Sequence, residues 1–280
     1  MKVAIIGTGI AGNVAAYKLR QSHDSTVFEA DSYIGGHTNT VDVYENGQPF
    51  AVDTGFIVFN DRTYPNFIQL LDEIGQESQS SNMSFSVQAD DGSLEYSGTN
   101  LNTLFAQRSN LFRPAFHRMI RDILRFNRTA LPSTQHLDES DSLGDFLFEN
   151  DYSHEFVHHY LVPMAAAIWS AEPGGVLDMP VSFLVRFFEN HGLLQVNDRP
   201  TWRVIKGGSR QYVNKLVAGH RDRIRLNSPV ESVRRIDDRV EIISASGGRE
   251  MFDHVFLACH SDQALALLKD ATVAEREVLG

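Results

Sequence analysis

The chain is poor in cysteine, in basic residues and in long apolar runs, and each shortage excludes a class of protein. Its 280 residues include one cysteine, Cys259, so no internal disulfide can form and nothing requires an oxidising compartment. The 25 basic residues are outnumbered by 36 acidic ones, and this net charge of −11 argues against a surface built to neutralise nucleic-acid phosphates or anionic lipid, which leaves only local basic patches for such contacts. No run approaches the roughly 18 apolar residues of a membrane-spanning helix. We expect a cytoplasmic globular protein with room for two domains.

The first residues place a glycine-rich turn between an apolar strand and a helix. Residues 2–6, KVAII, are typical of a strand buried in a parallel sheet. Gly-x-Gly-x-x-Gly follows at Gly7, Gly9 and Gly12, and small and apolar residues then recur at helical spacing. The glycines and the basic residues close behind them argue against a secretion signal. This order of elements predicts the phosphate-binding turn of a Rossmann-type fold.

Each glycine has a physical task in such a turn. Gly7 permits the tight exit from the strand, Gly9 lets a pyrophosphate approach the backbone, and Gly12 lets the helix pack closely on the sheet. The first helical residues, Ile10 and Ala11, direct free N–H groups at the phosphates. We therefore expect the start of this helix to bind the diphosphate of a dinucleotide.

A second predicted strand, residues 26–30, ends in an acidic residue. Glu29 lies 20 residues beyond Gly9, the spacing at which a carboxylate accepts hydrogen bonds from a ribose diol. The same carboxylate would repel a 2′-phosphate. The pattern therefore favours NAD or FAD over NADP.

The stretch EADSYIGGHT, residues 29–38, separates these two cofactors. It resembles the FAD-dependent amine oxidase and phytoene desaturase superfamily, in which Glu-Ala after the first motif is followed by an arginine and then by Gly-Gly-[Arg/His]. The resemblance implies FAD as the cofactor, bound by the residues Glu29, Ala30, Gly35, Gly36, His37 and Thr38. Tyr33 replaces the family's arginine, so a charge-assisted phosphate contact is missing or supplied elsewhere.

Later segments carry the same resemblance, which is nearest to a bacterial branch of predicted NAD/FAD-binding oxidoreductases. VDTGF, residues 52–56, implies that Thr54, Gly55 and Phe56 lie near the flavin, and an amphipathic helix follows over 67–75. Trp202 is a further pocket candidate, ahead of a Gly-Gly turn and a helix from about residue 210. Among the closing strands, Val230 is implied to meet the adenine through its backbone.

The middle of the chain is predicted to hold a hairpin and a helix-rich region. Residues 83–98 alternate around the turn signal Asp91-Gly92. Residues 113–131 form an amphipathic helix whose arginines lie opposite its apolar face, and Pro132 interrupts the pattern. That basic face is interpreted as solvated, or as a docking surface for an acidic partner or a membrane.

His154, Glu155 and His158 spell the zinc-protease motif His-Glu-x-x-His. A zinc protease also needs a third ligand in register, and no His-x-x-Gly-x-x-His continuation follows. The segment instead resembles a helix of the bacterial flavoprotein branch. We therefore expect no metal site.

These observations predict an α/β protein. Residues 1–75 and 200–280 form the two parts of a Rossmann-type FAD-binding domain with a parallel sheet, and 76–199 form a mixed helical and antiparallel substrate domain. The resemblance implies a further C-terminal segment that this chain lacks. The predicted function is an FAD-dependent oxidoreductase of amine oxidase type, moving hydride from a C–N or C–C bond of a small or lipid-like substrate to flavin. No catalytic residue is assigned. An FAD-dependent desaturase or isomerase, an NAD-dependent dehydrogenase and a non-catalytic nucleotide-binding fragment remain alternatives.

Overall fold

A computed structural model describes residues 1–89, 92–138, 140–169, 171–195 and 200–280. The chain divides into two compact units. The first unit consists of residues 1–59, 64–80 and 203–280, and the second of residues 60–63 and 81–202. Asp91 of the predicted turn lies outside the described residues.

A four-stranded parallel sheet forms the centre of the first unit, in the order β10-β2-β1-β14. Its strands are β1 (Lys2–Ile6), β2 (Asp24–Phe28), β10 (Ile224–Arg225) and β14 (His254–Leu257). Ala4 and Ile6 of β1 enter one apolar cluster while Val3 and Ile5 enter another, so both faces of β1 are covered. The uninterrupted apolar run at residues 2–6 reflects this two-sided burial.

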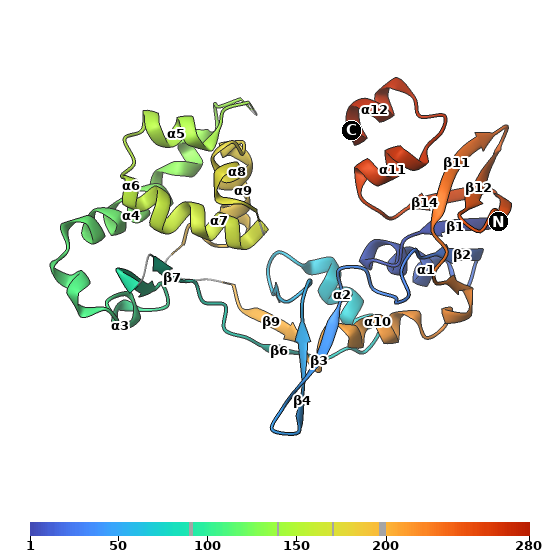
Figure 1. Cartoon of the computed structure of the whole chain (residues 1–280), viewed down its shortest axis with the longest axis horizontal. Helices are drawn as coiled ribbons and strands as arrows, with labels where there is room; N and C mark the ends of the chain where they lie inside the picture. Colours follow the sequence, from blue (N-terminus) through green and yellow to red (C-terminus); the bar gives the residue numbers. More distant parts are fainter. Residues whose placement is uncertain (90–91, 139, 170, 196–199) are drawn as a thin grey trace. The chain divides into compact units, whose positions relative to one another are not determined.

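Helices and smaller sheets complete the first unit (Figure 1). The helices are α1 (Ile10–Leu19), α2 (Pro65–Glu73), α10 (Arg210–Val217), the 3₁₀ turn η4 (Arg221–Arg223), α11 (Ser261–Leu267) and α12 (Val273–Leu279). An antiparallel sheet is ordered β11-β12-β13, a hairpin pairs β3 with β4, and β6 pairs with β9. Their bounds are β3 (Thr40–Glu45), β4 (Gln48–Asp53), β5 (Phe59–Asn60), β6 (Ser78–Ser80), β9 (Trp202–Ile205), β11 (Val230–Ile236), β12 (Arg239–Ser244) and β13 (Arg249–Phe252).

The second unit is mainly helical, with one hairpin of β7 (Ser86–Ala89) and β8 (Leu94–Ser97). Its helical elements are α3 (Leu101–Leu104), η2 (Arg108–Phe112), α4 (Pro114–Thr134), α5 (Leu143–Glu149), α6 (His154–Phe156), η3 (Val157–Leu161), α7 (Val162–Trp169), α8 (Pro173–Leu177) and α9 (Val181–Asn190). One large core centres on Phe126, Phe156 and Phe188. Among the described residues no helix is long and apolar enough to cross a membrane.

The expected interruption of the helix at Pro132 is wrong, because α4 continues to Thr134 with this proline inside its last turn. Pro132 removes one backbone hydrogen bond, the one to the Arg128 carbonyl, and α4 ends only two residues later. A second proline, Pro163, follows η3, a π-helical turn. Pro163 has no N–H for the His159 carbonyl, which instead accepts a 2.6 Å hydrogen bond from the Tyr96 hydroxyl.

Candidate functional site

One cavity of the first unit brings together most of the residues predicted to bind the cofactor. It lies at the carboxyl ends of β1, β2 and β14, where open parallel sheets bind ligands. Its volume, about 970 Å³, suits a cofactor. The predicted residues that line it are Gly7, Gly9, Ile10, Ala11, Glu29, Ala30, Gly35, Gly36, His37, Thr38, Phe56 and Val230. Gly12, Thr54 and Gly55 are not among the lining residues.

The first and third glycines are required by the packing of the chain itself. Gly7 has a φ of +103°, and a Cβ there would lie 2.4 Å from the Ala258 carbonyl oxygen. A Cβ on Gly12 would lie 2.0 Å from the Gly7 carbonyl oxygen. Both distances are far below van der Waals contact. Gly7 therefore lets the turn approach the residue after β14, and Gly12 lets α1 pack against the turn.

Gly9 is different, because the packing of the described chain gives no reason for a glycine there. Its backbone, with φ −62° and ψ −178°, is open to any residue. A Cβ at Gly9 would meet no atom within 4 Å. Gly9 is also the N-cap of α1, which has no side-chain cap and no acidic residue in its first turn. The first N–H groups of the helix, at Ile10 and Ala11, therefore border the cavity with their positive dipole end unoccupied by any side chain.

Glu29 directly follows β2 and is hydrogen-bonded to the glycine turn. Its Oε2 accepts a 2.9 Å hydrogen bond from the Thr8 N–H and another from the Thr8 hydroxyl, and its Oε1 accepts one of 2.9 Å from the Asp31 N–H. These three bonds leave about one acceptor position of the carboxylate free, since an ionised carboxylate has about four. Glu29 thus has a structural task, with acceptor capacity left for a ligand.

Thr8 joins the first glycine loop, residues 7–12, to the second glycine loop, residues 35–36. No sequence motif had pointed to Thr8. Its fully buried hydroxyl donates to Glu29 and accepts a 3.3 Å hydrogen bond from the Gly35 N–H. A Cβ on Gly36 would lie 3.1 Å from the Gly9 Cα, so the two loops nearly touch. The Tyr33 hydroxyl, at the position of the family's arginine, donates to the Gly36 carbonyl at 3.1 Å. Tyr33 therefore stabilises the second glycine loop through this hydrogen bond.

Aromatic side chains line another part of the cavity. Phe67 contacts Phe56 and Tyr212 edge-to-face, with ring centroids 5.2 and 5.3 Å apart. Tyr64 also lines the cavity, and burial raises its pKa. The Tyr212 and Thr38 hydroxyls share a 2.5 Å hydrogen bond, and burial raises the pKa of Tyr212. Tyr212 therefore remains a neutral phenol that fixes the orientation of Thr38.

Two histidines stack at the cavity. The His37 and His260 rings lie 5.5 Å apart and nearly parallel, at 7°. No lysine or arginine occurs among the described residues that line the cavity. An imidazole can donate a hydrogen bond in either protonation state, so this pair can face an anion. The neighbouring Cys259 thiol has a pKa raised by burial and stays protonated near neutral pH.

Several lining residues escaped the sequence analysis, namely Thr8, Asp31, Tyr64, Phe67, Tyr212, Ser228, Pro229, Cys259, His260 and Gln263. A usable signal existed for Cys259 and His260, because they come just after the short apolar run of β14 (His254–Leu257). The carboxyl end of a parallel strand borders the ligand crevice. No sequence signal indicated Tyr212, whose partner Thr38 lies 174 positions away.

Residues 54–56 support the second glycine loop, and only Phe56 lines the cavity. The Phe56 N–H donates to the His37 carbonyl at 3.0 Å, and a Cβ on Gly55 would lie 2.1 Å from the same oxygen. Thr54 donates from its N–H to the Asn39 carbonyl at 2.9 Å. Gly55 is thus required by close packing on this loop.

Two other candidates lie in the second unit. Trp202 stacks near His191, with ring centroids 6.5 Å apart. The zinc-protease pattern places His154 and His158 4.3 Å apart between ring centroids, but Glu155 accepts a 3.1 Å hydrogen bond from Arg118 Nε. This ion pair lowers the pKa of Glu155. Among the described residues no group of three or more His, Cys, Asp or Glu side chains could hold a metal ion.

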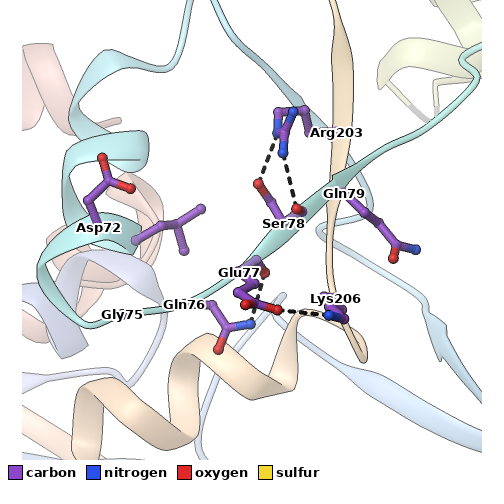
Figure 2. A pocket seen from close by; sticks show the side chains of 9 residues that line it. Asp72, Gly75, Gln76, Glu77, Ser78, Gln79, Arg203 and Lys206 are labelled. Carbon is purple, nitrogen blue, oxygen red and sulfur yellow. Dashed lines mark hydrogen bonds and ion pairs between the residues drawn. The ribbon is translucent and has the colours of Figure 1, made fainter.

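A second hollow of the first unit, an open groove of about 590 Å³, contains none of the predicted site residues. Figure 2 shows its basic side chains bound to the neighbouring strand. Arg203 donates to Ser78 Oγ at 2.9 Å, and Lys206 Nζ lies 2.8 Å from Glu77 Oε2. Because both basic side chains already have partners within the groove, it offers no free positive charge for an anionic ligand.

Comparison with known proteins agrees with the cavity. The sequence profile of the flavin-containing amine oxidoreductases matches residues 10–277. No protein of curated function is significantly similar in sequence.

Solved structures share the fold. Cyclohexylamine oxidase from Brevibacterium oxydans superposes with a TM-score of 0.73 at 21% identity over 99% of this chain and 62% of its own. Putrescine oxidase bound to putrescine superposes with a TM-score of 0.70 at 19% identity, over 100% of this chain and 63% of its own. A CLA-producing fatty acid isomerase from P. acnes superposes with a TM-score of 0.64 at 16% identity, over 99% of this chain and 63% of its own. The chain thus spans less than two thirds of the length of these proteins. The profile match confirms the predicted superfamily, and the chain belongs to the flavin-containing amine oxidoreductase family, whose cofactor is FAD.

Proposed function

We propose that the protein is an FAD-dependent oxidoreductase of amine oxidase type and that FAD binds in the cavity between the glycine loops. The observation that carries this proposal is Gly9. It is a glycine without a conformational or packing reason, at an uncapped helix N-terminus, with open space where its Cβ would be. A diphosphate approaching the backbone would explain the missing side chain.

The nucleotide half of FAD would bind through backbone and imidazole groups. The N–H groups of Ile10 and Ala11 face the diphosphate, and the adjacent His37 and His260 rings donate hydrogen bonds in place of the family's arginine. Glu29 accepts a hydrogen bond from the ribose with its remaining acceptor position. Val230, at the start of β11, borders the adenine with its backbone.

The flavin half would lie toward the aromatic residues. When bound, FAD accepts hydride equivalents from a C–N or C–C bond of the substrate. Phe56 and Phe67 exclude water from this part of the cavity, and Tyr212 holds the Thr38 side chain in place. The protonated Cys259 adds no negative charge. Residues 76–199 supply the substrate contacts, and the substrate is a small or lipid-like molecule.

An FAD-dependent isomerase or desaturase is the second candidate. The fatty acid isomerase shares this fold, and the fold alone does not separate the two chemistries. An NAD-dependent dehydrogenase is disfavoured, because it would leave the second glycine loop at the cavity without a ligand.

Identifying the molecule released by heating the purified protein tests the cofactor. We expect FAD in about equimolar amount, and a colourless protein that binds NADH would refute the assignment. Anaerobic mixing of the FAD-loaded protein with candidate amines then tests the reaction class. Bleaching of the flavin supports oxidation, whereas double-bond migration in an unsaturated fatty acid without bleaching supports the isomerase. An FAD-loaded protein inert toward all substrates would mean that this chain binds nucleotide without catalysis.

A further inference from the structure

A strongly basic segment lies in the second unit of this acidic protein. Residues 101–131 contain six arginines and a single acidic residue, Asp122, although the whole chain has a net charge of −11. Four of these arginines bind groups within the unit itself, since Arg108 donates to Asn102 Oδ1 at 2.8 Å and Arg113 donates to the Ser93 carbonyl. Arg118 is paired with Glu155, and Arg125 contacts Asp122 at 3.3 Å and the Asn150 carbonyl at 3.0 Å. The local excess of positive charge is therefore only partly explained by internal ion pairs.

Two other arginines of α4 have no such partner. Arg121 and Arg128 are exposed, and neither makes a hydrogen bond or an ion pair with any described residue. They share one face of α4 with His117 and Leu124, since residues 117, 121, 124 and 128 follow the helical period. Leu124 is 54% exposed in the middle of this stripe. The stripe thus combines unpaired positive charge with an exposed apolar side chain.

The turn before α4 adds two more exposed apolar side chains to the beginning of this stripe. Phe112 is 86% exposed and Leu111 is 45% exposed. The His117 ring donates a 2.9 Å hydrogen bond to the Leu111 carbonyl, which holds the turn against the first residue of the stripe. We call the six residues Leu111, Phe112, His117, Arg121, Leu124 and Arg128 the α4 patch.

We propose that the α4 patch binds the surface of a lipid bilayer that contains anionic phospholipids. Arg121 and Arg128 would contact lipid phosphates, while Phe112, Leu111 and Leu124 enter the boundary between headgroups and acyl chains. An acidic protein could pair with the arginines. A bilayer additionally offers an apolar layer directly beneath an anionic one, which matches the alternation of arginine with exposed leucine and phenylalanine on the stripe.

Co-sedimentation of the 280-residue chain with vesicles tests this proposal. We expect binding to vesicles of phosphatidylcholine with phosphatidylglycerol and little binding to phosphatidylcholine alone. The double variant Arg121→Glu/Arg128→Glu should partition at least about thirtyfold less, because each basic residue near an anionic surface contributes about fivefold. Phe112→Ser/Leu124→Ser should also reduce binding. The readout involves no flavin, so it does not depend on the proposed cofactor.

Matched controls separate the patch from overall charge. Arg221→Glu/Arg276→Glu changes the net charge equally at exposed arginines of the first unit, and Phe148→Ser removes an equally exposed phenylalanine of the second. Both should bind like the wild type. Circular dichroism melting of every variant verifies folding. Absence of vesicle binding by the wild type, or equal loss in the controls, would overturn the proposal. Binding to soluble polyglutamate but not to vesicles would overturn it in favour of an acidic protein partner.

Discussion

Replacing Gly9 by alanine separates ligand binding from folding. The backbone at Gly9 is one that alanine adopts freely, and the added Cβ meets no atom within 4 Å. Alanine is a poorer N-cap than glycine but also restricts the unfolded chain, and these opposing effects are each about 0.5–1 kcal/mol. The free energy of unfolding of the FAD-free protein should therefore change by less than about 1 kcal/mol.

Binding of FAD should respond much more strongly. A methyl group between the Gly9 backbone and a phosphate would weaken one charge-assisted hydrogen bond, a loss of about 1.5–3 kcal/mol. We therefore expect the dissociation constant for FAD to rise about tenfold to a hundredfold. The matched control is Gly12→Ala, whose Cβ would lie 2.0 Å from the Gly7 carbonyl oxygen. That variant should lose folding stability even without FAD.

Urea unfolding of the FAD-free variants and calorimetric titration with FAD measure these two quantities. The reasoning is refuted if Gly9→Ala binds FAD as tightly as the wild type. It is equally refuted if Gly9→Ala loses as much folding stability as Gly12→Ala, because the glycine would then have a packing role that the structure does not contain.

Further predictions concern other side chains. Glu29→Ala should weaken FAD binding by about 1–3 kcal/mol and also destabilise the FAD-free protein, because Thr8 loses its partner; titration and urea unfolding check both, and unchanged FAD affinity would contradict the ribose role. His260→Ala should weaken FAD binding and, because His260 is the N-cap residue of α11, lower the urea midpoint slightly; wild-type FAD affinity would exclude an imidazole contact to the cofactor. His220 is fully buried, neither ring nitrogen has a hydrogen-bond partner in the described structure, and burial lowers its pKa. Below about pH 6.5 this histidine is protonated in the unfolded chain but stays neutral in the folded chain. The free energy of unfolding therefore falls by up to about 1.4 kcal/mol for each pH unit below that value. His220→Leu should flatten the pH dependence of the urea midpoint between about pH 7 and 5, and an unchanged slope would show that other groups cause it.

The part of the site that could be predicted consists of elements set by local sequence, namely a strand, a glycine turn and a helix. The strand at residues 2–6, the glycines after it and the helix from Ile10 could be predicted because each depends on neighbours a few positions away. The end of α4 could not, because Pro132 removes only one backbone hydrogen bond and the two residues after it remain helical. Local pattern identifies a helix better than it locates its last turn.

Residue types at short and regular spacing determined the strand–turn–helix that forms one wall of the cavity and favoured NAD or FAD as its ligand. The resemblance of residues 29–38 and of later segments implied the family and, with it, FAD. Only the tertiary structure showed which side chains complete the cavity. Tyr212 meets Thr38 across 174 positions, and His260 stacks on His37 from the opposite end of the chain. It also showed that Arg118 and Arg125 have ion-pair partners, whereas Arg121 and Arg128 have none within the described part of the chain. Such contacts depend on how distant segments pack, and the pattern along any single segment does not encode them.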